Sequence, residues 1–193
     1  MARRINGGTV ALIAIAAVII ICIVWFIATY NGLILAKANV DAAWANVQTQ
    51  YQRRADLIPN LVTIANKTAN FQQETFTEIT QLRSQWGQAQ QSGDRAQMDQ
   101  LGQEMGSALS RLLVVVENYP SLDIEAFTTL QAQVEGTENR VSVERTRYNA
   151  QVKVFNVKIK IFPTVLVANM FGFTAEEYFA AQPGTEQVPV VTF

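Results

Sequence analysis

One uninterrupted apolar stretch near the N-terminus restricts the possible folds of this chain more than any other feature. Residues 9–29 read TVALIAIAAVIIICIVWFIAT, and no charged or strongly polar residue lies between Val10 and Ala28. A helix of about 20 residues, rising about 1.5 Å per residue, crosses the ~30 Å hydrocarbon core of a bilayer. The sequence therefore predicts a transmembrane helix over residues 9–29, preceded by a short basic arm, residues 1–8.

A cleaved signal peptide is the alternative for this stretch, because Ala36-Lys37-Ala38 resembles a small-x-small cleavage site. The apolar core of a signal peptide usually has only about 7–15 residues, and the candidate site lies well beyond the apolar run. A retained anchor is therefore favoured. Trp25 and Tyr30 support it, since amphipathic aromatic rings prefer the headgroup level of a bilayer.

The charges on either side of the stretch indicate its orientation. Arg3 and Arg4 precede it without an acidic neighbour, whereas Lys37 is opposed by Asp41 on the other side. By the positive-inside rule, we expect a cytoplasmic N-terminus in the inner membrane of the cell and an extracytoplasmic, periplasmic body.

Composition excludes several classes of protein. Fifteen basic residues face sixteen acidic ones, and they form no basic stripe, so a nucleic-acid partner is not expected. The chain has no histidine, which excludes His-based catalysis and His metal sites. Its one cysteine, Cys22, lies within the apolar stretch, where a thiolate is poorly solvated. Because the carboxylates form no catalytic constellation either, the sequence predicts no enzyme activity and no cofactor.

Beyond the apolar stretch, residues 39–91 show spacings of four and three that are typical of a packed helical seam. The seam positions are Val40, Trp44, Val47, Tyr51, Arg54, Ile58, Leu61 and Ala65. Pro59 removes one backbone hydrogen bond, which predicts a bend there. Ser92-Gly93-Asp94 ends this segment, and Asp94 with Gln97 predicts a capping box for the next helix.

Two further apolar stripes follow. The second stripe comprises Met98, Leu101, Met105, Leu109, Leu112, Val116 and Tyr119 and ends at Pro120. The third comprises Phe127, Leu130, Val134, Thr137, Val141, Arg145, Tyr148, Val152, Phe155, Ile159 and Phe162 and ends at Pro163. Thr174 with Glu177 predicts a small helix through Ala181, followed by an extended apolar tail, residues 183–193.

These stripes define the expected fold class, which is all-α. We expect one N-terminal transmembrane helix followed by an elongated, antiparallel four-helix-type bundle with long helices over residues 30–182.

Several motifs carry a resemblance to a known family. They are Tyr30-Asn31, Val40-Asp41, Ala43-Trp44, the run QRRADLIPNLV at 52–62, Glu117-Asn118-Tyr119-Pro120, Glu138-Asn139-Arg140, Arg147-Tyr148-Asn149, Phe155-Asn156, Phe162-Pro163, Phe171-Gly172-Phe173 and Tyr178-Phe179. In this order they resemble the signature of the LemA family, although Phe155 stands where a tyrosine is common. The terminal residues 190–193 also differ from the charged variant of the family.

The resemblance implies a bacterial-type membrane protein with a short arm, one span and a four-helix bundle. It implies no activity, because the family has no agreed biochemical function. One relative takes part in forming magnetosome membranes, which implies a connection with membrane organisation.

Arg54 is the most unusual seam residue, because a lone buried charge is costly. The structural interpretation is an ion pair with an acidic residue of the third stripe, Glu138 or Glu144. The functional alternative is a docking patch of Arg53, Arg54 and Asp56 for another membrane protein, such as a sensor kinase or protease. For Arg53 a solvent-exposed position is the default.

Two aromatic–asparagine pairs, Tyr148-Asn149 and Phe155-Asn156, are separated by one heptad. Their rings are expected to face the seam, and their amides to hydrogen-bond neighbouring backbone or a partner helix. The complete set of structural or partner-contact candidates is Trp44, Arg53, Arg54, Asp56, Pro59, Glu138, Arg140, Tyr148, Asn149, Phe155, Asn156 and Pro163.

The apolar residues near the C-terminus suggest self-assembly. The candidates are Phe171, Phe173, Val190, Val191 and Phe193, which either dock on their own chain or exchange with a neighbouring subunit. We therefore expect a non-enzymatic, membrane-anchored protein that forms homo-oligomers through lateral helix and tail contacts and organises the bilayer. An adaptor for another membrane protein is the alternative.

Overall fold

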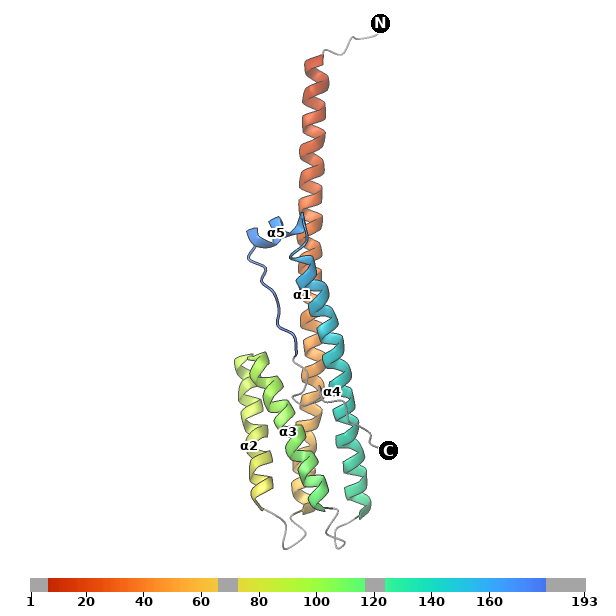
Figure 1. Ribbon diagram of the computed structural model, residues 1–193, viewed down its shortest axis with the longest axis vertical. Coiled ribbons are helices and arrows are strands. Elements are labelled where there is room, and N and C mark those ends of the chain that lie inside the picture. The colour runs from red at the N-terminus through yellow and green to blue at the C-terminus, as the bar shows by residue number, and fades with distance from the viewer. Residues whose placement is uncertain (1–6, 66–72, 117–123, 180–193) are drawn as a thin grey trace, which may run out of the picture. The chain divides into compact units, whose positions relative to one another are not determined.

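The computed structural model describes residues 7–65, 73–116 and 124–179, and regular structure within these ranges is entirely helical. The helices are α1 (Gly7–Ala65), α2 (Gln73–Ser92), α3 (Arg95–Val116), α4 (Ile124–Lys158) and α5 (Thr164–Met170) (Figure 1). The expected all-α fold with long helices is confirmed.

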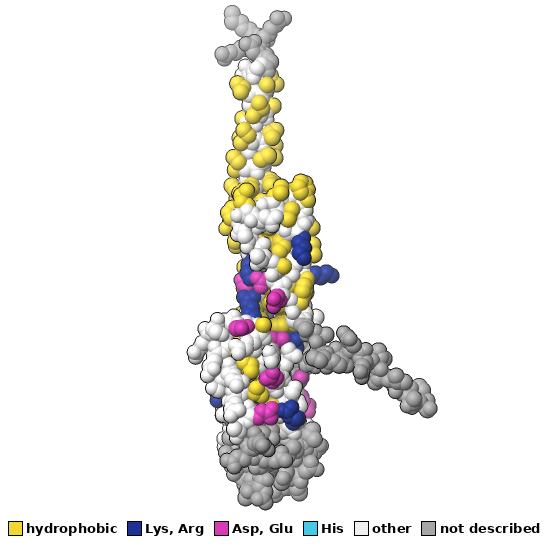
Figure 2. Space-filling model, turned by 60° about the vertical axis from the view of Figure 1, so that its left-hand side comes forward, with side chains coloured by type: hydrophobic (Ala, Val, Ile, Leu, Met, Phe, Trp, Pro, Cys, Tyr) yellow, Lys and Arg dark blue, Asp and Glu magenta, His cyan; other side chains and the backbone are white. Residues whose placement is uncertain are grey.

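Helix α1 has 59 residues and contains the whole apolar stretch. Its most apolar window has a mean hydropathy of 3.3, and none of that window is buried against the protein. Figure 2 shows the hydrophobic side chains that cover this part of the helix. By length and composition, α1 can cross a membrane. The helix continues beyond Pro59 to Ala65, and the bend expected at this proline stays a prediction.

Contacts divide the chain into two units, which we describe separately. Unit 1 comprises Met1–Ala42 and Asn149–Tyr178, and unit 2 comprises Ala43–Tyr148 and Phe179–Phe193. Both α1 and α4 contribute one part of their length to each unit.

Unit 2 is a bundle of four helical segments, built around the predicted seams. The C-terminal part of α1 buries Val47, Tyr51 and Ile58, and α3 buries Met98, Met105 and Leu109. Helices α2 and α3 form a hairpin at Gly93, whose φ of 72° lies in the left-handed region that glycine adopts freely. Asp94 Oδ1 accepts a hydrogen bond from the Gln97 backbone N–H at 2.9 Å, which confirms the predicted start of α3.

The predicted helical segment 39–91 belongs to two helices rather than one. Its first part lies in α1 and its last part is α2, which buries Ile79, Trp86 and Ala89. Both helices show the same amphipathic period, because each packs an apolar stripe into the core of unit 2.

In unit 1, the C-terminal part of α4 packs beside the part of α1 that follows the apolar stretch. Leu33 and Val40 of α1 and Val152 and Phe155 of α4 are almost completely buried. Near the end of α4, Lys158 Nζ donates a hydrogen bond to the Gly32 carbonyl oxygen at 2.7 Å. This contact pairs the end of α4 with the residues that directly follow the apolar stretch.

Two sequence predictions in unit 1 are wrong. Phe162 is 79% exposed rather than part of the seam, because α4 ends at Lys158 and the chain turns before Pro163. The small helix predicted from Thr174 does not form within the described residues, since residues 173–179 contain no helix. The backbone of Glu176 bonds to a side chain of α4 instead, which removes the local advantage of a helical turn.

Candidate functional site

A buried polar layer crosses unit 2 and contains Arg54, which is only 2% exposed. Its Nη1 donates a hydrogen bond to the Gly102 carbonyl oxygen at 3.0 Å. Its Nη2 lies 3.7 Å from Glu138 Oε2, so the expected ion pair with α4 is present. Burial lowers the pKa of the Arg54 guanidinium, and the charge of Glu138 opposes this effect. The Glu138 side chain is half exposed, which leaves part of the pair in contact with solvent.

Tyr51 and Asp99 form the second part of this layer. The Tyr51 hydroxyl donates a short hydrogen bond to Asp99 Oδ1, and Arg145 Nη2 lies 3.4 Å from Asp99 Oδ2. Burial of Tyr51 and the charge of Asp99 together raise the pKa of the phenol well above its usual value. The layer therefore joins α1, α3 and α4 through polar contacts inside an otherwise apolar core.

Two glycines of α3 make room for these large side chains. A Cβ atom at Gly102 would lie 2.5 Å from the Tyr51 ring, and one at Gly106 would lie 2.5 Å from Arg54 Nη1. This role of the two glycines was not predicted from the sequence. The available signal was the four-residue spacing of the two glycines, which places both on one side of a helix.

Aromatic side chains close another part of unit 2. The rings of Trp44, Tyr148 and Phe179 contact one another, with centroids 4.6–6.0 Å apart. The Arg145 guanidinium lies 4.9 Å from the Phe179 ring centroid, a cation–π arrangement. Trp44 and Tyr148, two of the predicted candidates, are thus core residues, and their rings pack against the ring of Phe179.

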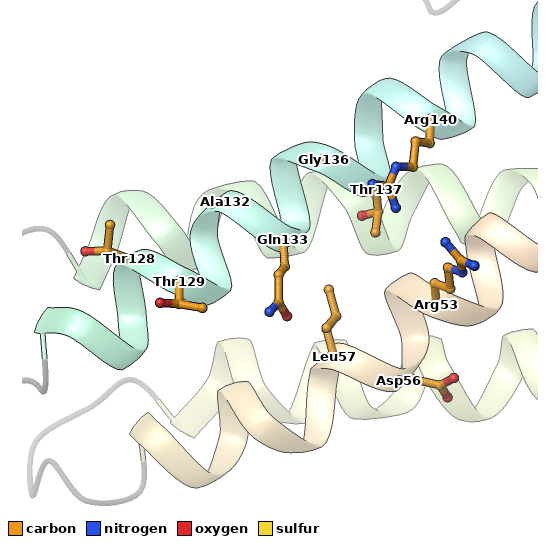
Figure 3. Close-up of a pocket in the computed structure, with 10 residues that line it drawn as sticks. All are labelled: Arg53, Asp56, Leu57, Thr128, Thr129, Ala132, Gln133, Gly136, Thr137 and Arg140. Carbon is orange, nitrogen blue, oxygen red and sulfur yellow. The ribbon is translucent and has the colours of Figure 1, made fainter.

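An open groove lies between α1 and α4 in unit 2 and has a volume of about 770 Å³ (Figure 3). It brings together the predicted candidates Arg53, Asp56 and Arg140, all of which are exposed. The remaining lining residues are Leu57, Thr128, Thr129, Ala132, Gln133, Gly136 and Thr137. With two guanidinium groups and several hydroxyls, this groove can bind an acidic or hydrogen-bonding segment of another protein.

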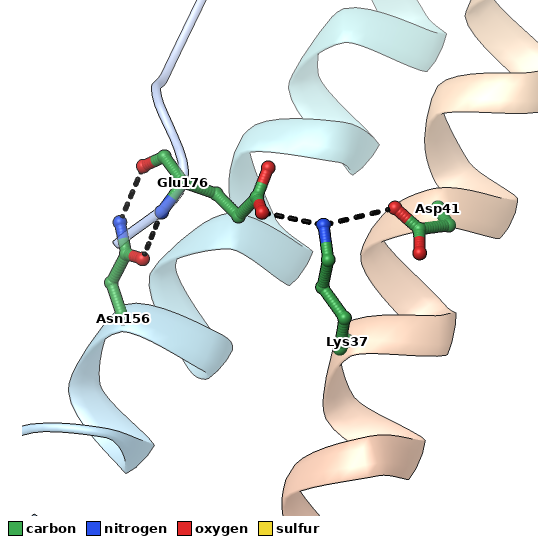
Figure 4. A network of polar contacts seen from close by, with 4 residues as sticks. All are labelled: Lys37, Asp41, Asn156 and Glu176. Carbon is green, nitrogen blue, oxygen red and sulfur yellow. Dashed lines mark hydrogen bonds and ion pairs between the residues drawn. The ribbon is translucent and has the colours of Figure 1, made fainter. Parts of the chain in front are cut away.

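A polar network in unit 1 connects α1, α4 and the segment after α5 (Figure 4). The Asn156 amide donates to the Glu176 carbonyl oxygen and accepts from the Glu176 N–H, both at 2.8 Å. Lys37 Nζ binds the carboxylates of both Glu176 and Asp41. Burial alone would lower the pKa of Lys37, but the hydrogen bonds and charges of the two carboxylates outweigh it and raise the pKa. Asn156 thus bonds to neighbouring backbone, as its position beside the seam predicted.

Aromatic rings attach the same segment to the end of the apolar stretch. The Phe171 ring centroid lies 4.5 Å from that of Tyr30 and 5.9 Å from that of Phe26. The Phe173 ring lies 6.3 Å from both Tyr30 and Phe155. Phe171 and Phe173 thus contact residues of their own chain, and an exchange with a neighbouring subunit stays a prediction. Val190, Val191 and Phe193 lie outside the described residues.

The remaining candidates occupy positions with a structural role. Pro59 lies inside α1, Pro163 immediately precedes α5, and Asn149 is half-buried beside Tyr148. In the part of the chain that the structure describes, no group of three or more Cys, Asp or Glu side chains could hold a metal ion.

These features define a class: an all-helical protein whose bundle is continuous with a helix able to cross a membrane. Residues 43–193 match the family model of the LemA family. Because this match covers well over half of the sequence, the chain belongs to the LemA family.

Relatives match over almost the complete chain. It is 26% identical to the magnetosome proteins MamQ 1 and MamQ 2 of Paramagnetospirillum magneticum, and 28% identical to the magnetosome protein MamQ of Magnetospirillum gryphiswaldense. Each alignment covers 98% of this chain and 79% of the relative.

Proposed function

We propose that this protein is a non-enzymatic, single-pass membrane protein that assembles laterally with copies of itself and organises the bilayer. The uninterrupted course of α1 from the apolar stretch to the polar layer carries the proposal. None of the most apolar window of α1 is buried against the protein, so lipid is the environment that can cover its side chains. The similarity to magnetosome proteins supports a role at a membrane.

The proposal includes the orientation that the flanking charges indicate, with the N-terminus in the cytoplasm and the body outside it. A reporter enzyme fused after Phe193 reads this orientation directly. Activity restricted to the cytoplasmic side would contradict it.

An unpartnered apolar stripe on α4 supports lateral assembly with a second copy of the chain. Val143, Ala150, Val154 and Val157 follow one another at heptad-compatible spacings, and all are exposed. They lie on a different side of α4 from the buried seam that contains Tyr148 and Val152. We call these four residues the outer stripe. Tethering in one plane raises the effective concentration of chains, so that a narrow stripe suffices for pairing.

The paired change Val143→Glu and Val154→Glu is expected to dissociate the oligomers. Each carboxylate would be desolvated in the contact between two α4 helices, and like charges would face each other. Light scattering in mild detergent measures the mass over a range of concentrations, while circular dichroism checks that helix content is unchanged.

The matched control places the same two charges on α3, at the exposed positions Ser107 and Ser110. This Ser107→Glu, Ser110→Glu variant should stay oligomeric. A wild-type protein that is monomeric at all concentrations would contradict lateral assembly.

The groove between α1 and α4 favours a second function, an adaptor for another membrane protein. Arg53 and Arg140 outnumber Asp56 among its lining residues, which gives the groove a net positive charge that suits an acidic helix of a partner. A photo-crosslinker at Thr129, in the groove, tests this in native membranes, with one at Ser110 on α3 as the control. Recovery of a different protein from Thr129 alone supports the adaptor, whereas recovery of self-contacts alone counts against it.

A further inference from the structure

The region around α5 exposes large apolar side chains to an unusual degree. The exposed fractions are 50% for Ile161, 79% for Phe162, 57% for Leu166, 70% for Met170 and 48% for Phe171. Val167 and Ala168 of the same short helix are almost fully buried. Helix α5 is thus attached by one side and presents an apolar surface on the other, which is costly in water. We call residues 161–171 the foot.

Contacts with α1 fix the level of the foot along the apolar stretch. Phe171 packs on Phe26 and Tyr30, and α4 meets α1 at Gly32. Phe26 lies three residues inside Thr29, the end of the stretch, which corresponds to a depth of about 4.5 Å along the helix. Helices that lie in a membrane interface insert their apolar side about 5–10 Å into the headgroup–acyl boundary. Figure 1 shows α5 beside this part of α1.

The charges along this part of the sequence also suit a membrane surface. No acidic residue occurs between Glu144 and Glu176. The basic residues of this interval that belong to unit 1 are Lys153, Lys158 and Lys160. Lys160 is exposed directly beside Ile161 and Phe162, where its ammonium group can reach headgroup phosphates while the apolar neighbours insert.

We propose that the foot inserts into the headgroup–acyl boundary of the same bilayer leaflet in which the apolar stretch of α1 ends. This inference rests on the proposed membrane anchor. The occupant is lipid rather than a second copy, because the apolar surface of the foot continues that of α1, whose Trp25 and Ile27 are also exposed at this level. The foot gives unit 1 a second contact with the bilayer, which fixes its rotation about the α1 axis.

Depth-dependent fluorescence quenching tests the foot in the full-length chain. The labelled variant combines Cys22→Ala, which removes the native thiol, with Met170→Cys. An environment-sensitive fluorophore is attached to the cysteine at position 170. The protein is reconstituted in vesicles of phosphatidylcholine and phosphatidylglycerol that contain lipids with a nitroxide either near the headgroup end or near the tail end of the acyl chain. Aqueous iodide is the competing quencher. We expect stronger quenching by the headgroup-end nitroxide than by the tail-end nitroxide, and little quenching by iodide.

Two control positions separate the possible outcomes. The native Cys22, labelled in detergent in the otherwise unchanged chain, should be quenched mainly by the tail-end nitroxide, since it lies inside the apolar stretch. The exposed Ser107 of α3, as Ser107→Cys in the Cys22→Ala background, should be quenched by iodide alone.

Failure of lipid quenching at Cys22 would overturn the anchor itself. Lipid quenching at Cys22 together with iodide quenching at position 170 would leave the anchor intact and overturn the foot. Shielding of position 170 from both iodide and lipid nitroxides would also overturn it, because a second protein chain would then cover this surface. Adding Leu166→Asp to the chain labelled at position 170 should reduce quenching by the lipid nitroxides. In a second chain that carries Leu166→Asp and the label on the native Cys22, lipid quenching should persist.

Discussion

Replacing Gly102 with alanine should lower the free energy of unfolding of unit 2 by about 1–3 kcal/mol. The added Cβ would lie 2.5, 2.6 and 2.8 Å from three atoms of the Tyr51 ring. This ring cannot move away easily, because Tyr51 is completely buried and its hydroxyl is bonded to Asp99. In an open helical position, the same substitution would stabilise by about 0.5–1 kcal/mol through helix propensity, so the sign of the effect identifies the close contact.

Gly87 of α2 provides that open position, since a Cβ there meets nothing within 4 Å. Gly87→Ala should therefore leave stability unchanged or raise it. Gly106→Ala should cost less than Gly102→Ala, because its Cβ would meet the flexible end of the Arg54 side chain. Denaturant unfolding of the full chain in detergent, with Trp25 replaced by Phe so that the fluorescence reports Trp44 and Trp86, measures the three values. Equal stabilities for Gly102→Ala and Gly87→Ala would show that Tyr51 and α3 do not approach as closely as described.

The second large effect is expected for Asn156→Leu, which removes both hydrogen bonds to the Glu176 backbone. Asn156 is only 6% exposed, so the Glu176 N–H and carbonyl would lose their partners in a half-buried location. At about 0.5–1.5 kcal/mol for each bond, local detachment of the segment should become about 1–3 kcal/mol easier. Amide hydrogen exchange at Glu176 should then accelerate by about 10–100-fold, because each 1.4 kcal/mol corresponds to a factor of about ten.

Asn156→Asp refines this test. An aspartate still accepts a hydrogen bond from the Glu176 N–H but cannot donate to the carbonyl oxygen, so we expect an intermediate acceleration. Asn139→Leu, at an exposed position of α4, is the control and should not change exchange at Glu176. Unchanged exchange in Asn156→Leu would mean that Lys37 and the aromatic rings alone hold the segment.

The buried seams were predictable from the sequence because helix packing requires a fixed spacing of apolar residues. The spacing identified Val40, Val47 and Tyr51 as core positions, and each is completely buried. The ion pair of Arg54 was predictable for a related reason, since a charge on a seam requires a nearby partner of opposite sign. Of the two acidic residues considered, Glu138 is the one that the structure pairs with Arg54.

Features that depend on contacts between distant segments were harder to predict. The capping pattern at Thr174 is local, and it competes with Asn156, a side chain twenty residues away that bonds to the Glu176 backbone. The groove beside Arg53 likewise arises only when small residues of α4 come to lie opposite α1. Phe162 is exposed because α4 ends at Lys158. No helix-breaking residue at that position predicts this end.

The continuity of α1 has a consequence for the response of the protein to bilayer thickness. A span joined to its body by a flexible linker can adjust to a thinner or thicker hydrocarbon layer without affecting the body. Helix α1 includes no linker between Gly7 and Ala65, so a mismatch has to be met by tilting the helix or by deforming the surrounding lipid. In the proposed membrane-spanning state, local membrane thickness therefore places a mechanical load on the residues that pack around Leu33 and Val40.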